Sequence, residues 1–350
     1  MKKNLIYSIL VIFTGLCLKS CVTSNQNIDY VSNKIEASKT LETIAFGSCN
    51  KSNLSQKYWQ TIDKTNPDLW IWLGDMIYAD TDNMDKLESM YKDQKSNAYY
   101  ADFESKTSII GIWDDHDYGV NDGGKNFAKK KESQQLMFDF LNVSKQAEPR
   151  KTEGIYQSYT FGENGKKIKI ILLDTRYFRD DLQPNPTRKT RYLVNETGDI
   201  LGEAQWKWLE DELVNSTAEI NIIGSSIQIL AEEQIFEKWA NFPVARQRFL
   251  DLIAKTQPKS PILLSGDRHI GEIAKIELDN FDTPIYEITS SGLTHAYTKS
   301  AAKNEINKYR INKLVNEKHF AVLKIDWETG KIVAEIHNME GKVVVKQELL

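Results

Sequence analysis

Four short hydrophobic segments of this chain are each followed directly by acidic, thiol or imidazole side chains. These segments, each typical of a buried strand, are 42–47, 68–73, 108–113 and 261–266. In layered α/β folds the carboxyl ends of the strands meet at one edge, so the polar residues that follow should lie together. Carboxylates crowded in this way repel one another unless a cation lies among them. The pattern therefore predicts a site for multivalent metal ions.

Taken one at a time, most of these residues also have ordinary structural explanations. Asp75 would fit a turn before a helix, and Cys49 would fit a small buried hydrophobic position. Tyr78 could pack its ring in the core, and His269 could be a hydrogen-bonded core histidine. The run 114–117, Asp-Asp-His-Asp, resists such an explanation because three acids and a histidine after a buried strand are costly to leave unpaired.

Strand and helix patterns alternate along much of the chain and favour an α/β layered fold in one domain, 41–350. The last three strands are predicted to form an antiparallel meander, and the polar loop 180–200 a lid or pocket wall. Five tryptophans at strand or helix spacing are predicted to be core residues: Trp70, Trp72, Trp113, Trp206 and Trp208. Further strands are expected at 155–161, 167–174, 219–224, 273–278, 284–289, 319–326, 331–337 and 342–347, and helices at 55–65, 84–95, 126–142, 203–214, 243–256 and 300–314.

The N-terminus is typical of an export signal. Two lysines precede an apolar stretch, 5–18, which is too short to span a bilayer comfortably. The sequence Leu-Lys-Ser-Cys at 18–21 resembles a bacterial lipoprotein cleavage site, although its lysine is unusual there. We therefore expect a lipoprotein-type signal peptide at 1–20, a lipid on Cys21 and a polar tether at 21–40. An ordinary secretory signal or a single N-terminal anchor is the alternative, and each would export the domain to the periplasm or cell surface.

Composition and missing motifs exclude several classes of function. The chain has 45 basic and 49 acidic residues, a formal net charge of −4, so no nucleic-acid partner is indicated. The sequence has neither a complete G-x-x-x-x-G-K-[ST] phosphate loop nor a G-x-S-x-G serine-hydrolase elbow. If two of the three cysteines belong to the signal, Cys49 is left alone and no disulfide is expected.

The ordered set of motifs resembles the calcineurin-like metallophosphatase superfamily, and most closely its PhoD-like alkaline phosphatase/phosphodiesterase branch. The resemblance implies a four-layer α-β-β-α sandwich with mixed sheets. Three further segments also resemble that branch: 173–179, 201–209 and 290–295. The motifs that carry the resemblance are Gly47-Ser48-Cys49, Gly74-Asp75-x-x-Tyr78, Asp115-His116 and Gly266-Asp267-x-His269.

Two features depart from the family pattern. The extra N-terminal β-domain of some members has no room in this chain. A histidine motif of the wider superfamily is absent between the third and last motifs, where Gly-Ser-Ser-Ile-Gln stands at 224–228.

The resemblance implies a ferric ion with one or more calcium ions. Thiolate and phenolate donors suit a trivalent or borderline metal, whereas carboxylates suit hard cations such as calcium. The implied iron ligands are Cys49, Tyr78, Asp267 and His269, with Asp75 as the bridge and Asp115 and Asn121 on the second metal. Water activated by the metals would be the nucleophile.

Two further residues are assigned to the reaction itself. His116 is expected to protonate the leaving oxygen or stabilise the phosphoryl oxygens. Arg176 is the candidate phosphate clamp, since a guanidinium matches two phosphate oxygens, and a salt bridge to Asp174 or a neighbour is its alternative. Arg179 and Asn121 are further candidates for substrate binding. His295 is expected in the pocket or behind the ligands.

These assignments predict an exported phosphoric monoester or diester hydrolase, an alkaline phosphatase D-like enzyme that serves phosphate scavenging. A phospholipase-like phosphodiesterase acting on lipid headgroups or wall polymers is one alternative. A non-catalytic binding lipoprotein on the same scaffold is another. The expected partners are a phosphate ester and, through the lipid, a membrane, and we expect a monomer.

Overall fold

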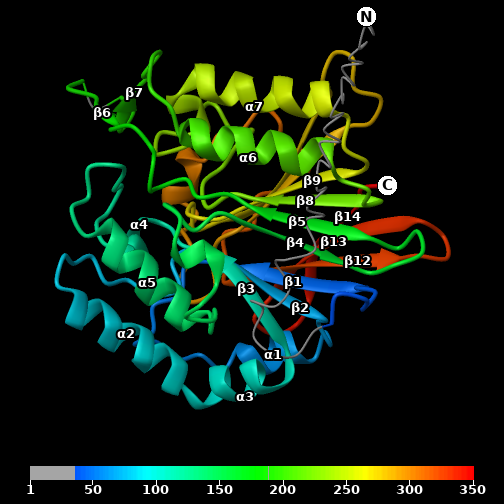
Figure 1. Ribbon diagram of the computed structural model, residues 1–350, viewed down its shortest axis with the longest axis horizontal. Helices are drawn as coiled ribbons and strands as arrows, with labels where there is room; N and C mark the ends of the chain where they lie inside the picture. The colour runs from blue at the N-terminus through cyan, green and yellow to red at the C-terminus, as the bar shows by residue number, and fades with distance from the viewer. Residues whose placement is uncertain (1–35, 188) are drawn as a thin grey trace, which may run out of the picture.

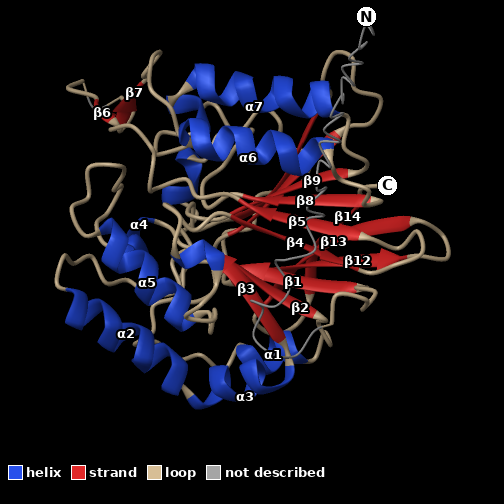
Figure 2. Cartoon of the chain, in the orientation of Figure 1, coloured by secondary structure: helices blue, strands red, loops and turns tan. Residues whose placement is uncertain are grey.

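A computed structural model describes residues 36–187 and 189–350 of the chain. Two six-stranded sheets pack face to face, and helices cover the outer faces of both, as Figures 1 and 2 show. This arrangement confirms the expected layered α/β sandwich with mixed sheets. The predicted signal peptide, Cys21 and most of the predicted tether lie outside the described residues. Within the described ranges no helix is both long and apolar enough to cross a bilayer.

The first sheet has the order β14-β13-β12-β1-β2-β3. Its strands β1, β2 and β3 are parallel, and β12 joins β1 in the antiparallel sense. The last three strands form the predicted antiparallel meander. The bounds are β1 Thr43–Gly47, β2 Leu69–Leu73, β3 Ser108–Ile112, β12 His319–Asp326, β13 Lys331–Asn338 and β14 Val343–Glu348.

The second sheet has the order β10-β11-β9-β8-β5-β4. Strands β11, β9, β8 and β5 run parallel, and β10 and β4 are antiparallel edge strands. The bounds are β4 Gln157–Phe161, β5 Ile168–Leu172, β8 Ile220–Gly224, β9 Pro261–Ser265, β10 Gly271–Ile276 and β11 Ile285–Ser290. In the second sheet the parallel strands occupy the middle, whereas in the first they occupy one end, with β3 at the edge.

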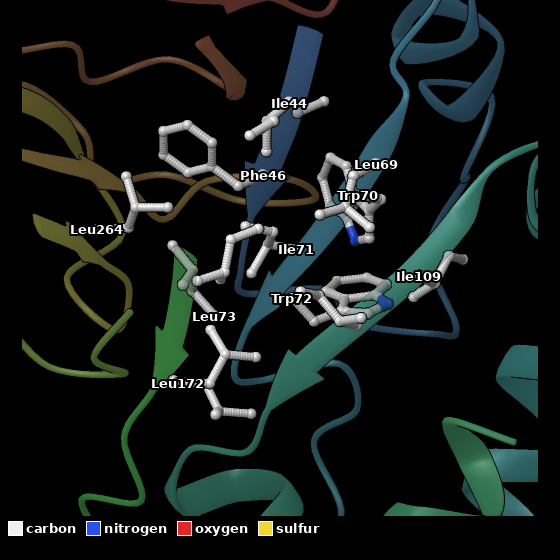
Figure 3. Packing of buried hydrophobic residues seen from close by; sticks show 14 of the residues in the cluster. Ile44, Phe46, Leu69, Trp70, Ile71, Trp72, Leu73, Ile109, Leu172 and Leu264 are labelled. Atoms are coloured by element: carbon white, nitrogen blue, oxygen red, sulfur yellow. The ribbon is translucent and has the colours of Figure 1, made fainter. Parts of the chain in front are cut away.

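Alternation along the central strands divides the core into two clusters. In β9, Leu264 packs in the cluster between the sheets, whereas Leu263 packs in the cluster under α6 and α7. Strand β5 does the same with Leu172 and Ile171. Successive side chains of a strand point to opposite faces, so an unbroken apolar run fills both layers. In Figure 3, Leu73 of the first sheet lies beside Leu172 of the second.

Seven α-helices lie in the described parts of the chain. In Figure 1, α6 and α7 cover the second sheet, and α1, α2 and α3 lie on the side of the first. Tryptophans of β2 pack against Trp59 of α1, with ring centroids 4.9 and 5.3 Å away. Of the five predicted core tryptophans, four are buried and Trp208 is half-buried. The helix bounds are α1 Trp59–Asp63, α2 Met84–Ser96, α3 Ala98–Lys106, α4 Asp115–Tyr118, α5 Lys130–Phe140, α6 Gly202–Val214 and α7 Pro243–Thr256.

The predicted helix 300–314 is wrong. Only a short 3₁₀ turn, Ala301–Asn304, forms there, and the chain then runs beside the edge strand β10. Glu305 is ion-paired with the buried Arg268, and Arg310 pairs with Glu272. These long-range contacts outweigh the helical propensity of the segment, which is a weak preference. The predicted loop 180–200 contains a small two-stranded sheet, β6 Gln183–Pro184 with β7 Tyr192–Leu193.

Candidate metal centre

The six predicted metal ligands come together where the parallel strands end. Each follows a strand end of β1, β2, β3 or β9, so the topology carries them to one edge of the sandwich. Ligand atoms within 4.8 Å of one another form three groups, which are Cys49–Asp75–His269, Asp75–Asp115–His116 and Asp114–Asp115–Asp267. Asp75 and Asp115 are each shared by two groups. The edge therefore offers adjoining metal positions linked by common carboxylates.

Tyr78 closes this cluster from the side of β2. Its Oη lies 3.1 Å from Nε2 of His269 and 3.2 Å from Nε2 of His295. The predicted position of His295 behind or beside the ligands therefore agrees with the geometry. The Cys49 Sγ lies 3.4 Å from Asp75 Oδ2 and 3.0 Å from Ser291 Oγ.

Four of the ligands have a left-handed backbone conformation. The φ angles are 64° at Cys49, 51° at Asp75, 64° at Asp267 and 53° at His269. This region costs a non-glycine residue about 1–3 kcal/mol, and such strain concentrates at functional sites. The strand ends are thus turned sharply, which directs these side chains toward a common point.

The glycine of each Gly-Asp motif allows another segment of the backbone to approach closely. A Cβ on Gly74 would lie 2.4 Å from the Cβ of Asp114, and one on Gly266 would lie 2.5 Å from the carbonyl oxygen of Leu73. Both distances are shorter than real Cβ contacts, so any side chain would force the strand ends apart. The motif glycines hold the two sheet edges close enough to share ligands.

Burial makes the anionic forms of these groups unfavourable in the absence of a cation. It raises the pKa of Cys49 to about 11, and the pKa of Asp75 rises well above its usual value through burial and the neighbouring Cys49. Tyr78 shows the same upward pKa shift from burial and from Asp75. Asp75 Oδ1 is buried and has no hydrogen-bond partner among the described residues. A multivalent cation would satisfy that oxygen and reverse these shifts, so the donor set fits metal ions.

Burial keeps the two histidines beside Tyr78 neutral, as a metal ligand such as His269 must be. Burial, followed by the charge of His295, lowers the pKa of His269 far below its usual value. Burial also lowers the pKa of His295 to about 4. A neutral imidazole has the free lone pair that metal coordination requires.

His116 differs from them because it has an acid partner. Its Nδ1 lies 2.8 Å from Asp80 Oδ1, and its ring lies 4.2 Å from that of Tyr78 between centroids. Burial disfavours the imidazolium, but the hydrogen bond with Asp80 and the charges of Asp75 and Asp115 raise the pKa of His116 to about 10. A protonated His116 at the edge of the cluster is a suitable proton donor.

Arg176 and Arg179 lie behind the cluster in buried ion pairs. Arg176 donates from Nε to Asp114 Oδ1 at 2.7 Å and from Nη1 to Glu237 Oε2 at 2.7 Å. Arg179 Nε lies 2.9 Å from Glu237 Oε1. Arg176 therefore forms salt bridges, which was the alternative to the phosphate clamp. Its partners are Asp114 and Glu237, not Asp174. The phosphate-clamp role of Arg176 stays a prediction.

Asn121 is not brought into the cluster. It is exposed, and its amide donates to Asp122 Oδ2 at 2.6 Å. The neighbouring Asp122 reaches the cluster through its backbone, because its N–H donates to Asp115 Oδ2 at 2.6 Å. Asp115 is the one acid of the cluster whose pKa is lowered. Burial alone would raise it, but the charges of Arg176 and His116 and the backbone N–H groups of Asp122 and His116 outweigh that effect.

Several residues that complete the site escaped the sequence analysis. Ser291 Oγ contacts Cys49 and accepts from the backbone N–H of His269 at 2.7 Å, and Asp80 holds His116. Ser291 lies in the family-like segment 290–295, and Asp80 follows the Gly74-Asp75-x-x-Tyr78 motif by two residues, so these motifs were the available signal. Glu237 has no such signal, because it is far in sequence from both arginines that it binds. Ser226, in the segment without the expected histidine motif, donates to Asp114 Oδ1 at 2.7 Å.

Known proteins with related sequences point to one family. The profile described as "PhoD-like phosphatase" matches residues 44–343. Alkaline phosphatase D of Bacillus subtilis (strain 168) is 22% identical over 293 residues, which cover 71% of this chain and 48% of that protein. The chain thus spans about half the length of that curated relative.

Solved structures share the fold. A structure of PhoD aligns with a TM-score of 0.69 at 18% identity, over 89% of this chain and 69% of that one. GAP50, titled the anchor in the inner membrane complex of Plasmodium, aligns at 0.55 and 14% identity, over 89% of each chain. A dimetal phosphatase from Danio rerio aligns at 0.52 and 12% identity, over 89% of this chain and 99% of that one. With most of its length matched by the profile, the chain belongs to the PhoD-like phosphatase family.

Proposed function

We propose that this protein is a metal-dependent hydrolase of phosphoric esters. The observation that carries the proposal is Asp75, a buried carboxylate shared by two groups of potential ligands and left with an unpartnered oxygen. A carboxylate in that position is suited to bridge two cations, and two-metal sites are widely used in phosphoryl transfer.

We assign the metals as the family resemblance implies, with iron(III) at one position and calcium at the other. Cys49, Tyr78, Asp267 and His269 would hold the iron, Asp115 the calcium, and Asp75 both. Bound ions of this kind supply Lewis-acid activation of water and of the phosphoryl oxygens. The protein side chains then have to orient the ester and to deliver a proton.

His116 is the proposed proton donor. Asp80 holds Nδ1, which leaves Nε2 to give its proton to the ester oxygen that departs from phosphorus. The carboxylate of Asp80 keeps the ring charged before the reaction and fixes its orientation. In this proposal a water oxygen bonds to phosphorus, the phosphorus–oxygen bond to the alcohol breaks, and the departing oxygen takes the proton from His116.

The substrate-binding roles of Arg176, Arg179 and Asn121 remain proposals. A direct contact of Arg176 with phosphate would require it to release Asp114 or Glu237, because its side chain is fully buried between them. The arginines support the site in any case by holding these two acids in place.

Export, a lipid on Cys21 and a role in phosphate scavenging belong to the same proposal. Phospholipase-like cleavage of lipid headgroups or wall polymers is the alternative that a membrane tether would favour. A non-catalytic binding protein is the second alternative, because a similar fold also occurs in a protein titled as an anchor. The intact ligand cluster favours the enzyme over that alternative.

Hydrolysis assays test the proposal. The purified chain, supplied with iron and calcium, should release p-nitrophenol from p-nitrophenyl phosphate, from bis-p-nitrophenyl phosphate, or from both. A chelator should abolish the turnover, and the faster substrate would decide between monoester and diester preference. Absence of turnover on both esters and on a phospholipid, in a chain shown to contain both metals, would contradict the enzyme and favour a binding protein.

A further inference from the structure

Three buried arginines near the edge that carries the metal ligands are engaged with buried acids. Arg176 and Arg179 bind Glu237, and Arg268 pairs with Glu305 at 2.7 Å. Lys51 differs, because no carboxylate partner is found for its ammonium group within residues 36–187 and 189–350, and its side chain is only half-buried. A cation in this setting is available to an incoming anion.

The backbone of Lys51 is fixed to the ligand cluster. It lies two residues after Cys49, and its N–H donates to Thr294 Oγ1 at 2.8 Å. The same hydroxyl group donates to the carbonyl oxygen of Cys49 at 3.1 Å. The long side chain of Lys51 therefore extends from a backbone that is fixed next to a proposed metal ligand.

The ammonium group of Lys51 lies over a second ligand. Its Nζ is 5.3 Å from the centre of the Tyr78 ring, and the Tyr78 hydroxyl contacts both His269 and His295. The positive charge of Lys51 thus lies against a proposed metal ligand.

We propose that Lys51 binds a phosphate oxygen of the substrate and thereby favours dianionic phosphomonoesters over monoanionic diesters. This inference rests on the proposed function. A lysine ammonium is a compact charge on a flexible four-carbon stem, so it can follow a phosphate group without a fixed geometry. A monoester carries one more negative charge than a diester, and that charge is what Lys51 would neutralise.

Substitution of Lys51 tests this inference on the full-length, metal-loaded protein. For Lys51→Met we expect KM for p-nitrophenyl phosphate to rise on the order of 10-fold, because one charge-assisted hydrogen bond to the substrate is lost. The value of kcat should change little. KM for bis-p-nitrophenyl phosphate should change by less than about 3-fold. Lys51→Arg should restore most of the monoester affinity. Lys57→Met is the matched control, since Lys57 is an exposed lysine of the same loop.

Calorimetric titration with inorganic phosphate gives a readout that does not depend on turnover. Lys51→Met should weaken the dissociation constant on the order of 10-fold at unchanged metal content, and Lys57→Met should not. Equal losses on the two esters, or an unchanged phosphate affinity, would overturn the inference. If the wild-type protein hydrolyses neither of these esters nor a phospholipid, the proposed function fails, and the phosphate titration still decides the role of Lys51.

Discussion

Two groups of buried charges adjoin at the edge of the sandwich, and they are neutralised in different ways. The arginine network consists of Arg176, Arg179, Asp114 and Glu237, and its acids face guanidinium groups. The ligand cluster consists of Cys49, Asp75, Tyr78, Asp115, Asp267 and His269. Its Asp267 pairs with Arg268 at 3.2 Å, but within the described chain no arginine or lysine forms an ion pair with Asp75 or Asp115. Asp114 belongs to the network and lies within 4.8 Å of two acids of the cluster.

The difference shows which charges the protein balances itself and which it leaves for a ligand. Burying an ion without a partner costs several kcal/mol, and the arginine network avoids much of this cost by pairing. The cluster also keeps four residues in left-handed backbone conformations. A protein that bears both costs at one place is built to recover them by binding metal ions. Each substitution below changes one side of this comparison.

The largest effect is expected from Asp75→Asn. The amide retains the shape of the side chain but loses the charge that the two metal positions would share. Activity should fall by about 10⁴-fold or more, and at least one metal should be lost, because the Lewis-acid contribution is worth several kcal/mol. Turnover and elemental analysis measure this, with Asp102→Asn on the exposed face of α3 as control. Retention of full activity would remove Asp75 from the ligands.

Arg176→Met should act mainly on folding. It leaves Asp114 and part of Glu237 without a buried partner, and breaking such a pair costs about 3–5 kcal/mol of the free energy of unfolding. Urea denaturation measures the loss, and the added change Glu237→Gln should recover part of it. If the single variant instead keeps its stability and shows a raised KM, Arg176 is the phosphate clamp predicted from the sequence.

Asp80→Asn should lower kcat about 10- to 100-fold, a part of the usual contribution of general acid catalysis. The amide no longer favours a charged His116, although it still occupies the same place. Metal content and stability should stay close to those of the wild type, because the Asp80 side chain is 45% exposed. Asp82→Asn, an exposed neighbour on the same loop, is the control. A loss of metal in the Asp80 variant would show that Asp80 acts on the ligands and not on His116.

The smallest expected effect concerns Lys238, a cation next to the arginine network without a described acid partner. Burial and the charge of Arg268 lower its pKa from 10.5 to about 8. Between these values the unfolded chain holds a proton that the folded protein has released, so this residue makes stability rise with pH. The free energy of unfolding of the wild type, relative to Lys238→Met, should increase by about 1–2 kcal/mol from pH 8 to pH 10. A flat difference would contradict the shift.

Much of this fold could be predicted from local pattern. Strand β12 has the predicted bounds, 319–326, and α7 the predicted bounds, 243–256, since apolar periodicity decides both. The ligand side chains could be found because each directly follows a strand. Glu237 and Lys51 could not be found in this way, because what distinguishes them is a partner, or the lack of one, far away in sequence. The predicted helix at 300–314 failed for the same reason, since contacts of Glu305 and Arg310 outweigh its propensity.

Metal content of the purified full-length chain tests the central claim most directly. We predict at least two bound metal ions per chain by elemental analysis, with iron near one, and a visible tyrosinate-to-iron absorption band that Tyr78→Phe removes. Removal of the metals by a chelator should lower the melting temperature, because the buried acids then lose their cations. A chain that contains no metal after iron and calcium are supplied, and that melts at the same temperature with and without chelator, would contradict the claim.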